Sequence, residues 1–266
     1  MHSHKESAWT TAGRCAVRLA DSIVNLAVLL AFLLMVAYGA YALWDAKQVY
    51  AGADASEYTV YKPGENDESE SFEELRAINP EVFGWLTVYG THIDYPLVQG
   101  DDNTKYVNMD AKGNYSLTGS IFLDCRNEKD FSDAVSIIYG HDMAEDKMFG
   151  ELVEFQQKDY FDAHRYGKLY FGGHWYGIEF MAFVETDAYD TETYAPGTEA
   201  GQLPQFTQTL YAKATQKQQV DVAAGDHLVL LSTCTDASTN GRHILAGKII
   251  GEVMPDPFEQ SGKEKE

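Results

Sequence analysis

The chain has 266 residues, enough for one or two domains, and carries a formal net charge of −21. A surface this acidic repels phosphate groups, so the composition argues against nucleic acid as a partner. Three cysteines are too few for a disulfide scaffold. The hydrophobic share of 45% is ordinary for a globular core. The composition therefore indicates an acidic globular domain that needs no disulfide framework.

An uncharged apolar segment, residues 22–44, lies near the N-terminus. A membrane helix needs about 20 such residues, whereas the apolar core of a secretory signal has about 7–15. Basic residues precede the segment and acidic residues dominate after it. The positive-inside rule then predicts a single-pass protein of the cell membrane, with residues 1–21 in the cytoplasm and the remainder outside the cell. A cleaved signal is the alternative, because the small residues 51–55 would suit a signal peptidase.

The sequence that follows is rich in Asp, Glu and Ser and offers few apolar residues to bury. It predicts an extracellular acidic linker over residues 45–71, with a rigid stalk as the alternative. A folded domain is expected over residues 72–254, and a charged C-terminal tail over residues 255–266.

Short apolar runs separated by turn residues fill the folded region. Helical spacing of apolar residues predicts helices at 72–82, 145–156 and 198–215. Strands are expected at 84–89, 92–98, 120–124, 134–139, 168–171, 176–185, 227–231 and 242–253. Many short strands with few helices predict a mainly β fold with peripheral helices, arranged as a closed or nearly closed barrel.

Cys234 lies where one of these apolar strands runs into a small polar loop, with a turn expected at Asn240-Gly241 and Arg242 entering the next strand. A thiol at a strand end is held rigidly yet can be reached, which suits a nucleophile. A nearby guanidinium favours the thiolate or holds an oxyanion. The alternatives are a small buried core residue and a disulfide with Cys125.

A cysteine nucleophile needs a proton-transfer partner, and His141 has the matching position. It follows the apolar run 135–139 and Gly140, so it also lies where a buried strand meets a loop. His227 begins the Cys234 strand and is expected at its far end, and His243 alternates to the face opposite Arg242. Apart from His2 and His4 in the N-terminal tail, no Cys or His pair has metal-site spacing, so no metal is expected.

These features together resemble the sortases, which are membrane-anchored cysteine transpeptidases of Gram-positive bacteria. The resemblance rests on residues 231–234 ending in Cys234, on Arg242 shortly after, and on Tyr139-Gly-His141. The resemblance is to class B of the sortases in three further features: residues 103–107, residues 119–127 and the expected helix before the cysteine strand. The resemblance covers about residues 72–253. It implies an eight-stranded sortase-type β-barrel with Cys234, His141 and Arg242 as its catalytic trio, and no cofactor.

The resemblance also implies substrate contacts from Asn103, Val107, Tyr139 and Ser232. The implied reaction cleaves a C-terminal sorting motif of surface proteins, similar to Asn-Pro-x-Thr, after the Thr. The acyl group then passes to an amine of lipid II or peptidoglycan, or alternatively to a pilin lysine. Class B members often carry Leu at the position of Val107 and Glu at that of Thr235, so the exact motif stays open. They commonly carry an aromatic residue at the position of Cys125, which keeps the disulfide alternative open.

Two other functions are compatible with the residues. A cell-wall peptidase would use the same Cys–His chemistry, although enzymes of that kind place the cysteine before the histidine in sequence. A non-catalytic surface scaffold would leave Cys234 inert toward thiol reagents.

Overall fold

The computed structural model describes residues 3–64, 70–235 and 238–259. The chain forms two compact units, Met1–Gln48 and Val49–Glu266. The first unit belongs to a long helix, α1 (Ser3–Gly52).

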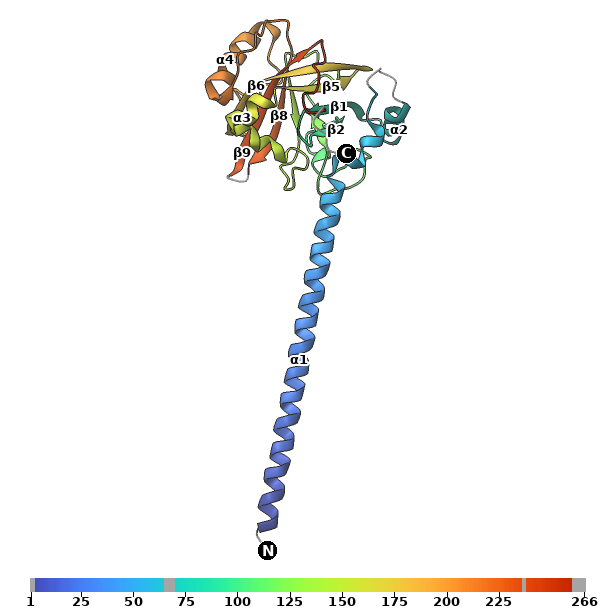
Figure 1. Ribbon diagram of the computed structural model, residues 1–266, viewed down its shortest axis with the longest axis vertical. Helices are drawn as coiled ribbons and strands as arrows, with labels where there is room; N and C mark the ends of the chain where they lie inside the picture. The colour runs from blue at the N-terminus through green and yellow to red at the C-terminus, as the bar shows by residue number, and fades with distance from the viewer. Residues whose placement is uncertain (1–2, 65–69, 236–237, 260–266) are drawn as a thin grey trace. The chain divides into compact units, whose positions relative to one another are not determined.

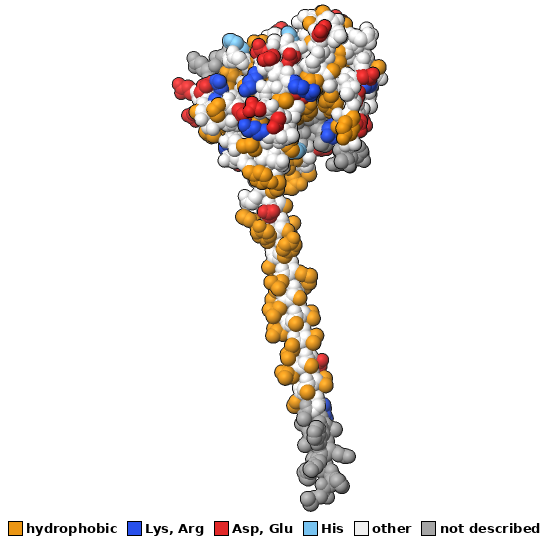
Figure 2. Space-filling view, turned by 180° about the vertical axis from the view of Figure 1, so that it is seen from behind, with side chains coloured by type: hydrophobic (Ala, Val, Ile, Leu, Met, Phe, Trp, Pro, Cys, Tyr) orange, Lys and Arg blue, Asp and Glu red, His pale blue; other side chains and the backbone are white. Residues whose placement is uncertain are grey.

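The helix α1 contains a stretch, Gly13–Tyr50, that is long and apolar enough to cross a bilayer. Hydrophobic side chains cover it almost throughout, whereas the surface of the second unit mixes acidic, basic and uncharged side chains (Figure 2). A signal sequence near an N-terminus meets the same criteria of length and composition. The structure therefore provides a helix suited to a bilayer, and its topology is taken up below as a proposal.

The second unit is mainly β. Its strands within the described residues are β1 (Val82–Val88), β2 (Asp94–Val98), β3 (Ile121–Leu123), β4 (Val135–Tyr139), β5 (Tyr166–Phe171), β6 (His174–Asp187), β7 (Ala214–Lys217), β8 (Leu228–Thr235) and β9 (Ser238–Ile250). Its α-helices are α2 (Glu70–Ile78), α3 (Lys158–Ala163) and α4 (Leu203–Lys213). Its 3₁₀ helices are η1 (Ala55–Glu57), η2 (Thr59–Tyr61), η3 (Lys105–Val107), η4 (Gly150–Gln156) and η5 (Ala200–Gln202).

Eight strands close into a barrel in the order β5-β1-β2-β3-β4-β8-β9-β6, because β6 also pairs with β5. The short strand β7 is added to β6 outside this ring. Most pairs are antiparallel, but β2 with β3 and β4 with β8 are parallel. The eight-stranded barrel with peripheral helices confirms the predicted fold (Figure 1).

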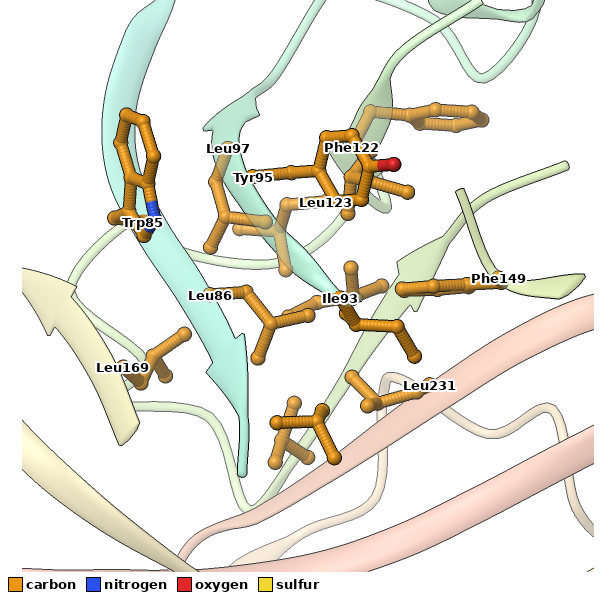
Figure 3. Packing of buried hydrophobic residues seen from close by; sticks show 14 of the residues in the cluster. Trp85, Leu86, Ile93, Tyr95, Leu97, Phe122, Leu123, Phe149, Leu169 and Leu231 are labelled. Carbon is orange, nitrogen blue, oxygen red and sulfur yellow. The ribbon is translucent and has the colours of Figure 1, made fainter. Parts of the chain in front are cut away.

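Buried residues occupy both faces of β4, β8 and β9. Alternate residues of a strand point to opposite faces. Ile138, Val229 and Leu231 accordingly join the core inside the barrel, where Trp85, Leu97 and other side chains meet (Figure 3). The intervening residues of the same strands join a second cluster with Leu203, Phe206 and Leu210 of α4. The helix α4 therefore covers the outer face of the β4–β8–β9 region.

The segment predicted as a solvated linker is partly packed instead. Ala53 and Tyr58 are buried in the main core, and Tyr95 donates a 2.8 Å hydrogen bond from its hydroxyl to the Ala53 carbonyl oxygen. Trp175 donates a 3.0 Å bond from its indole nitrogen to the carbonyl of Gly64. The few apolar residues of this acidic segment are therefore enough to fasten residues 53–64 to the domain.

The helix predicted over residues 145–156 begins five residues late, as the 3₁₀ helix η4 from Gly150. Glu145, Asp146 and Met148 have φ angles of 60°, 58° and 54°. This left-handed region is incompatible with a right-handed helix. Met148 is 3% exposed, so it is buried as the apolar periodicity predicted. It anchors a loop, however, and does not belong to the face of a helix.

The turn predicted at Asn240-Gly241 is wrong. Both residues lie within β9, where Gly241 pairs with Asp187 of β6. Residues 236–237, where the chain passes from β8 to β9, lie outside the described residues.

The C-terminal segment expected to be a charged tail is also partly packed. The Phe258 ring stacks on His164 with centroids 4.7 Å apart. It also occupies the space beside Gly90, where an added Cβ would lie 2.5 Å from the ring.

Candidate active site

The two parallel strands β4 and β8 deliver the predicted site residues to one place. Their register pairs Tyr139 with Ser232, and the amide of Gly140 then donates a 3.1 Å hydrogen bond to the Ser232 carbonyl oxygen. Parallel neighbours end at the same edge of a sheet. His141 follows the end of β4 by two residues, and Cys234 lies two residues beyond Ser232 in the last part of β8.

A pocket of about 350 Å³ lies at this edge. It is lined by Asn103, Val107, Ser120, Phe122, Tyr139, Gly140, His141, Ser232, Thr233 and Arg242. Six of the seven side chains that the sequence analysis singled out thus surround one cavity.

The seventh, Cys234, is described by its backbone alone. It pairs with Arg242 across the antiparallel strands β8 and β9, and its side chain lies outside the described part of the chain. The guanidinium of Arg242 donates a 2.8 Å hydrogen bond from Nη1 to the carbonyl of Gly241 and borders the pocket.

His141 is half-buried, and its Nε2 lies 2.9 Å from the carbonyl oxygen of Val107. A carbonyl oxygen accepts hydrogen bonds and cannot donate them, so Nε2 carries the proton of the neutral ring. Nδ1 is then the ring nitrogen that carries the lone pair. Val107, expected to contact substrate, therefore also orients the imidazole through its backbone.

The part of the pocket wall formed by Asn103 and Tyr139 belongs to a hydrogen-bonded group centred on Asp124, which is fully buried just after β3. Its Oδ2 accepts bonds from the Tyr139 hydroxyl at 2.9 Å and from Asn103 Nδ2 at 3.0 Å. Arg126 adds bonds from Nε and Nη2 at 2.8 and 2.7 Å. Burial raises the pKa of Asp124, but the hydrogen bonds from Arg126 and Tyr139 outweigh it, so the pKa is lowered overall.

Ser232 is also held from outside the barrel. Its Oγ lies 2.7 Å from the hydroxyl of Tyr194, a residue of the segment between β6 and α4. The Tyr194 ring stacks on that of Tyr139 with centroids 6.5 Å apart. Tyr139 and Ser232 are therefore fixed by the same neighbour.

Within the described residues, His227 and His243 do not line this pocket, as the sequence predicted. His227 contacts the Asp133 carbonyl at the opposite end of β8. His243 faces away from Arg242 and packs near Gln156 and Phe183. Asp124 and Tyr194 were not singled out from the sequence; an acid directly after a buried strand was the available signal for Asp124.

Two further predictions concern thiols and metals. Cys125 is a free thiol, so the alternative of a disulfide to Cys234 is not realised.

Separate segments bring possible ligand atoms of His92, Asp146 and Glu151 within 4.8 Å of one another. The Glu151 carboxylate in this group already accepts a hydrogen bond from the backbone amide of His92. Sequence spacing could not anticipate this group, because His92 lies far in the chain from Asp146 and Glu151.

Comparisons with known proteins agree with this architecture. Sortase B of Listeria monocytogenes serovar 1/2a is 33% identical over 210 residues, which are 77% of this chain and 82% of that protein. The crystal structure of a Streptococcus pyogenes class B sortase involved in pilus biogenesis shares 40% identity, with a TM-score of 0.62 and coverage of 67% of this chain and 97% of that one. The sortase B from the type II pilus of Streptococcus pneumoniae shares 42% identity, with a TM-score of 0.60 and coverage of 68% and 99%. No family model matches the chain.

The barrel and these relatives define the class of enzyme as a sortase, a cysteine transpeptidase. Within that class, the chain belongs to the class B sortases.

Proposed function

We propose that this enzyme cleaves a C-terminal sorting motif of surface proteins, similar to Asn-Pro-x-Thr, after the Thr, with Cys234 as the nucleophile. The observation that carries the proposal is the shared pocket edge: His141 and Arg242 line one cavity, and the backbone of Cys234 pairs with that of Arg242. The register of β8 and β9 places the backbone of Cys234 directly opposite that of Arg242.

In the acylation step, the thiolate attacks the Thr carbonyl carbon and a tetrahedral oxyanion forms. Arg242 stabilises that negative charge, and its planar guanidinium donates two hydrogen bonds at once. Protonated His141 gives the Nδ1 proton to the leaving amine when the C–N bond breaks. The same nitrogen then takes a proton from the incoming amine, which attacks the thioester and releases Cys234.

The acceptor amine belongs to lipid II or peptidoglycan, or to a pilin lysine. Identities of 40% and 42% to the two pilus-associated class B sortases, against 33% to the Listeria sortase B, favour the pilin lysine. Val107 and Thr235 depart from common class B residues, so the motif itself is best determined with a peptide panel.

For location, we propose that residues 22–44 within α1 span the cell membrane, that residues 1–21 lie in the cytoplasm and that the barrel lies outside the cell. The apolar stretch Gly13–Tyr50 and the basic residues before it support this orientation. Protease added to intact protoplasts should remove the barrel domain, and full protection would contradict the orientation.

The test uses the full-length enzyme in detergent micelles, incubated with a sorting peptide and analysed by mass spectrometry. We expect an acyl adduct on Cys234, and none with Cys234→Ala. Adding either a lysine-containing pilin domain or a peptidoglycan-derived amine then identifies the acceptor by the product formed. Absence of any adduct, or complete hydrolysis with both acceptors present, would contradict transpeptidation by this site.

A further inference from the structure

The buried carboxylate of Asp124 determines which hydrogen-bonding groups the pocket wall can offer. An ionised carboxylate accepts hydrogen bonds and cannot donate. The Tyr139 hydroxyl, 2.9 Å away, must therefore point its hydrogen at Asp124. Tyr139 lines the pocket, and its oxygen is left with lone pairs alone for any further partner.

The same carboxylate fixes the orientation of the Asn103 amide. Asn103 Oδ1 accepts a 2.7 Å hydrogen bond from the backbone amide of Cys125, and Nδ2 donates a 3.0 Å bond to Asp124. With both atoms assigned by their partners, the amide cannot flip without breaking two bonds. One N–H and one lone pair of Asn103 remain for a ligand.

Asp124 stays ionised in this buried position because the positive charge of Arg126 stabilises the carboxylate from the solvent side. The two guanidinium bonds to Asp124 come from a side chain that is 58% exposed, whereas that of Asp124 is 0% exposed. The oxygen that receives Tyr139 and Asn103 is Oδ2, which Arg126 Nη2 also contacts at 2.7 Å. An ionised carboxylate therefore lies directly behind the two lining residues Tyr139 and Asn103.

We propose that Asp124 is a positioning residue that makes this wall select a carboxamide side chain of the substrate over a carboxylate. A carboxamide supplies N–H donors for the Tyr139 oxygen and the Asn103 lone pair, and an acceptor for the free Asn103 N–H. A carboxylate supplies no donor, leaves the Tyr139 oxygen unpaired and places a second negative charge beside Asp124. The inference rests on the proposed function, because it concerns the side chains of the sorting motif.

The experiment measures acylation kcat/KM of the full-length enzyme with matched peptide pairs. One pair differs by Asn or Asp at the first motif position, the other by Gln or Glu at the third. For the wild type we expect a preference for the amide of at least about tenfold in one pair, which corresponds to about one lost hydrogen bond to a charged or buried group. Asp124→Asn should reduce that preference to within about threefold, mainly through KM.

A matched control is Asp133→Asn. Asp133 belongs to the same β3–β4 connection and holds Asn127 and the amide of Glu128, but it does not line this pocket. Its substitution should lower the melting temperature and leave the peptide preference unchanged. If Asp124→Asn lowers turnover of both peptides of each pair equally, Asp124 is a structural residue and the proposal is overturned.

Tyr139→Phe provides a second route should Asp124→Asn fail to fold, since it removes the lone pairs that Asp124 orients. It should also weaken the amide preference, and an unchanged preference would overturn the proposal. Mass spectrometry of the acyl adduct in the same samples distinguishes a failure of the Asp124 proposal from a failure of the proposed function. Adducts that form equally fast with both members of every pair contradict the role of Asp124 alone, whereas no adduct with any peptide contradicts the proposed function.

Discussion

The two walls of the pocket differ in how firmly their side chains are held. On one wall, Tyr139 and Asn103 are tied to the buried carboxylate of Asp124. On the other, His141 is held through a backbone carbonyl, and Arg242 bonds to the carbonyl of its own neighbour. Groups that recognise a ligand gain from being fixed in advance, whereas an imidazole that passes a proton exchanges hydrogen-bond partners during the reaction. We propose that the first, the recognition wall, holds the substrate and that the second, the reactive wall, carries out the chemistry.

The largest effect on the reactive wall is expected for His141→Ala. It leaves the nucleophile in place but removes the proton donor for the leaving amine, a loss of about 10²–10⁴-fold in kcat/KM. A small alkylating reagent should still modify the thiol, as read by mass spectrometry. If peptide turnover stays near normal while the melting temperature falls, His141 supports its strand and has no part in the reaction.

Arg242→Lys should reduce the acylation rate by about 10²–10³-fold, the range seen when a donor to an oxyanion is lost. Lysine keeps the charge but lacks the planar fork of donors. Stopped-flow or quench measurements of adduct formation isolate this step, and far-UV circular dichroism controls for folding. Near-normal acylation by Arg242→Lys would remove the oxyanion role.

Tyr194→Phe probes the support behind the recognition wall and should have a smaller effect. It deletes the hydroxyl that contacts Ser232 Oγ and keeps the ring that stacks on Tyr139. Loss of one neutral hydrogen bond costs about 1 kcal/mol. In a domain of this size that lowers the melting temperature by about 2–4 °C. An unchanged melting temperature in differential scanning calorimetry would show that Ser232 needs no partner.

The smallest effect concerns the ion pair between Asp54 and Lys147, which ties the segment after α1 to the loop that follows His141. Hydrogen bonds from Lys147 and Ser56 lower the pKa of Asp54 from 3.8 to about 2. A folded-state pKa below the unfolded value means that the stabilisation is present above pH 3.8 and disappears as the pH falls through about 2. The difference in melting temperature between wild type and Asp54→Asn should therefore shrink over this interval; a constant difference would contradict the pairing.

Strand positions and the strand-end site were predictable because local patterns encode them. The apolar runs before Tyr139 and Ser232 identify buried strands. The resemblance to sortases then predicted that the residues at the ends of these strands form one site. What the sequence could not show is which strands become neighbours, since the parallel pairing of β4 and β8 depends on tertiary contacts. The bonds of Asp124 to Asn103 and Tyr139 depend on the same pairing.

Local signals also misled where packing overrode them. Met148 and Phe155 have helical spacing, but positive φ angles at residues 145, 146 and 148 make the first part a loop that buries Met148. Asn240-Gly241 is a strong turn dipeptide, yet pairing with β6 keeps both residues in a strand. The roles of Cys234, His141 and Arg242 stay predictions that the substitutions above are designed to test.

The position of β8 in the ring has a consequence for how the protein is made. β4 lies between β3, its immediate predecessor in the sheet, and β8, which begins only at Leu228. Until the ribosome has produced β8, one edge of β4 has no partner strand and the ring cannot close. Long-range pairings of this kind form late and slowly. Under the topology proposed above, a chain exported while it is being made crosses the membrane before the ring can close, and it folds on the far side without first having to be unfolded.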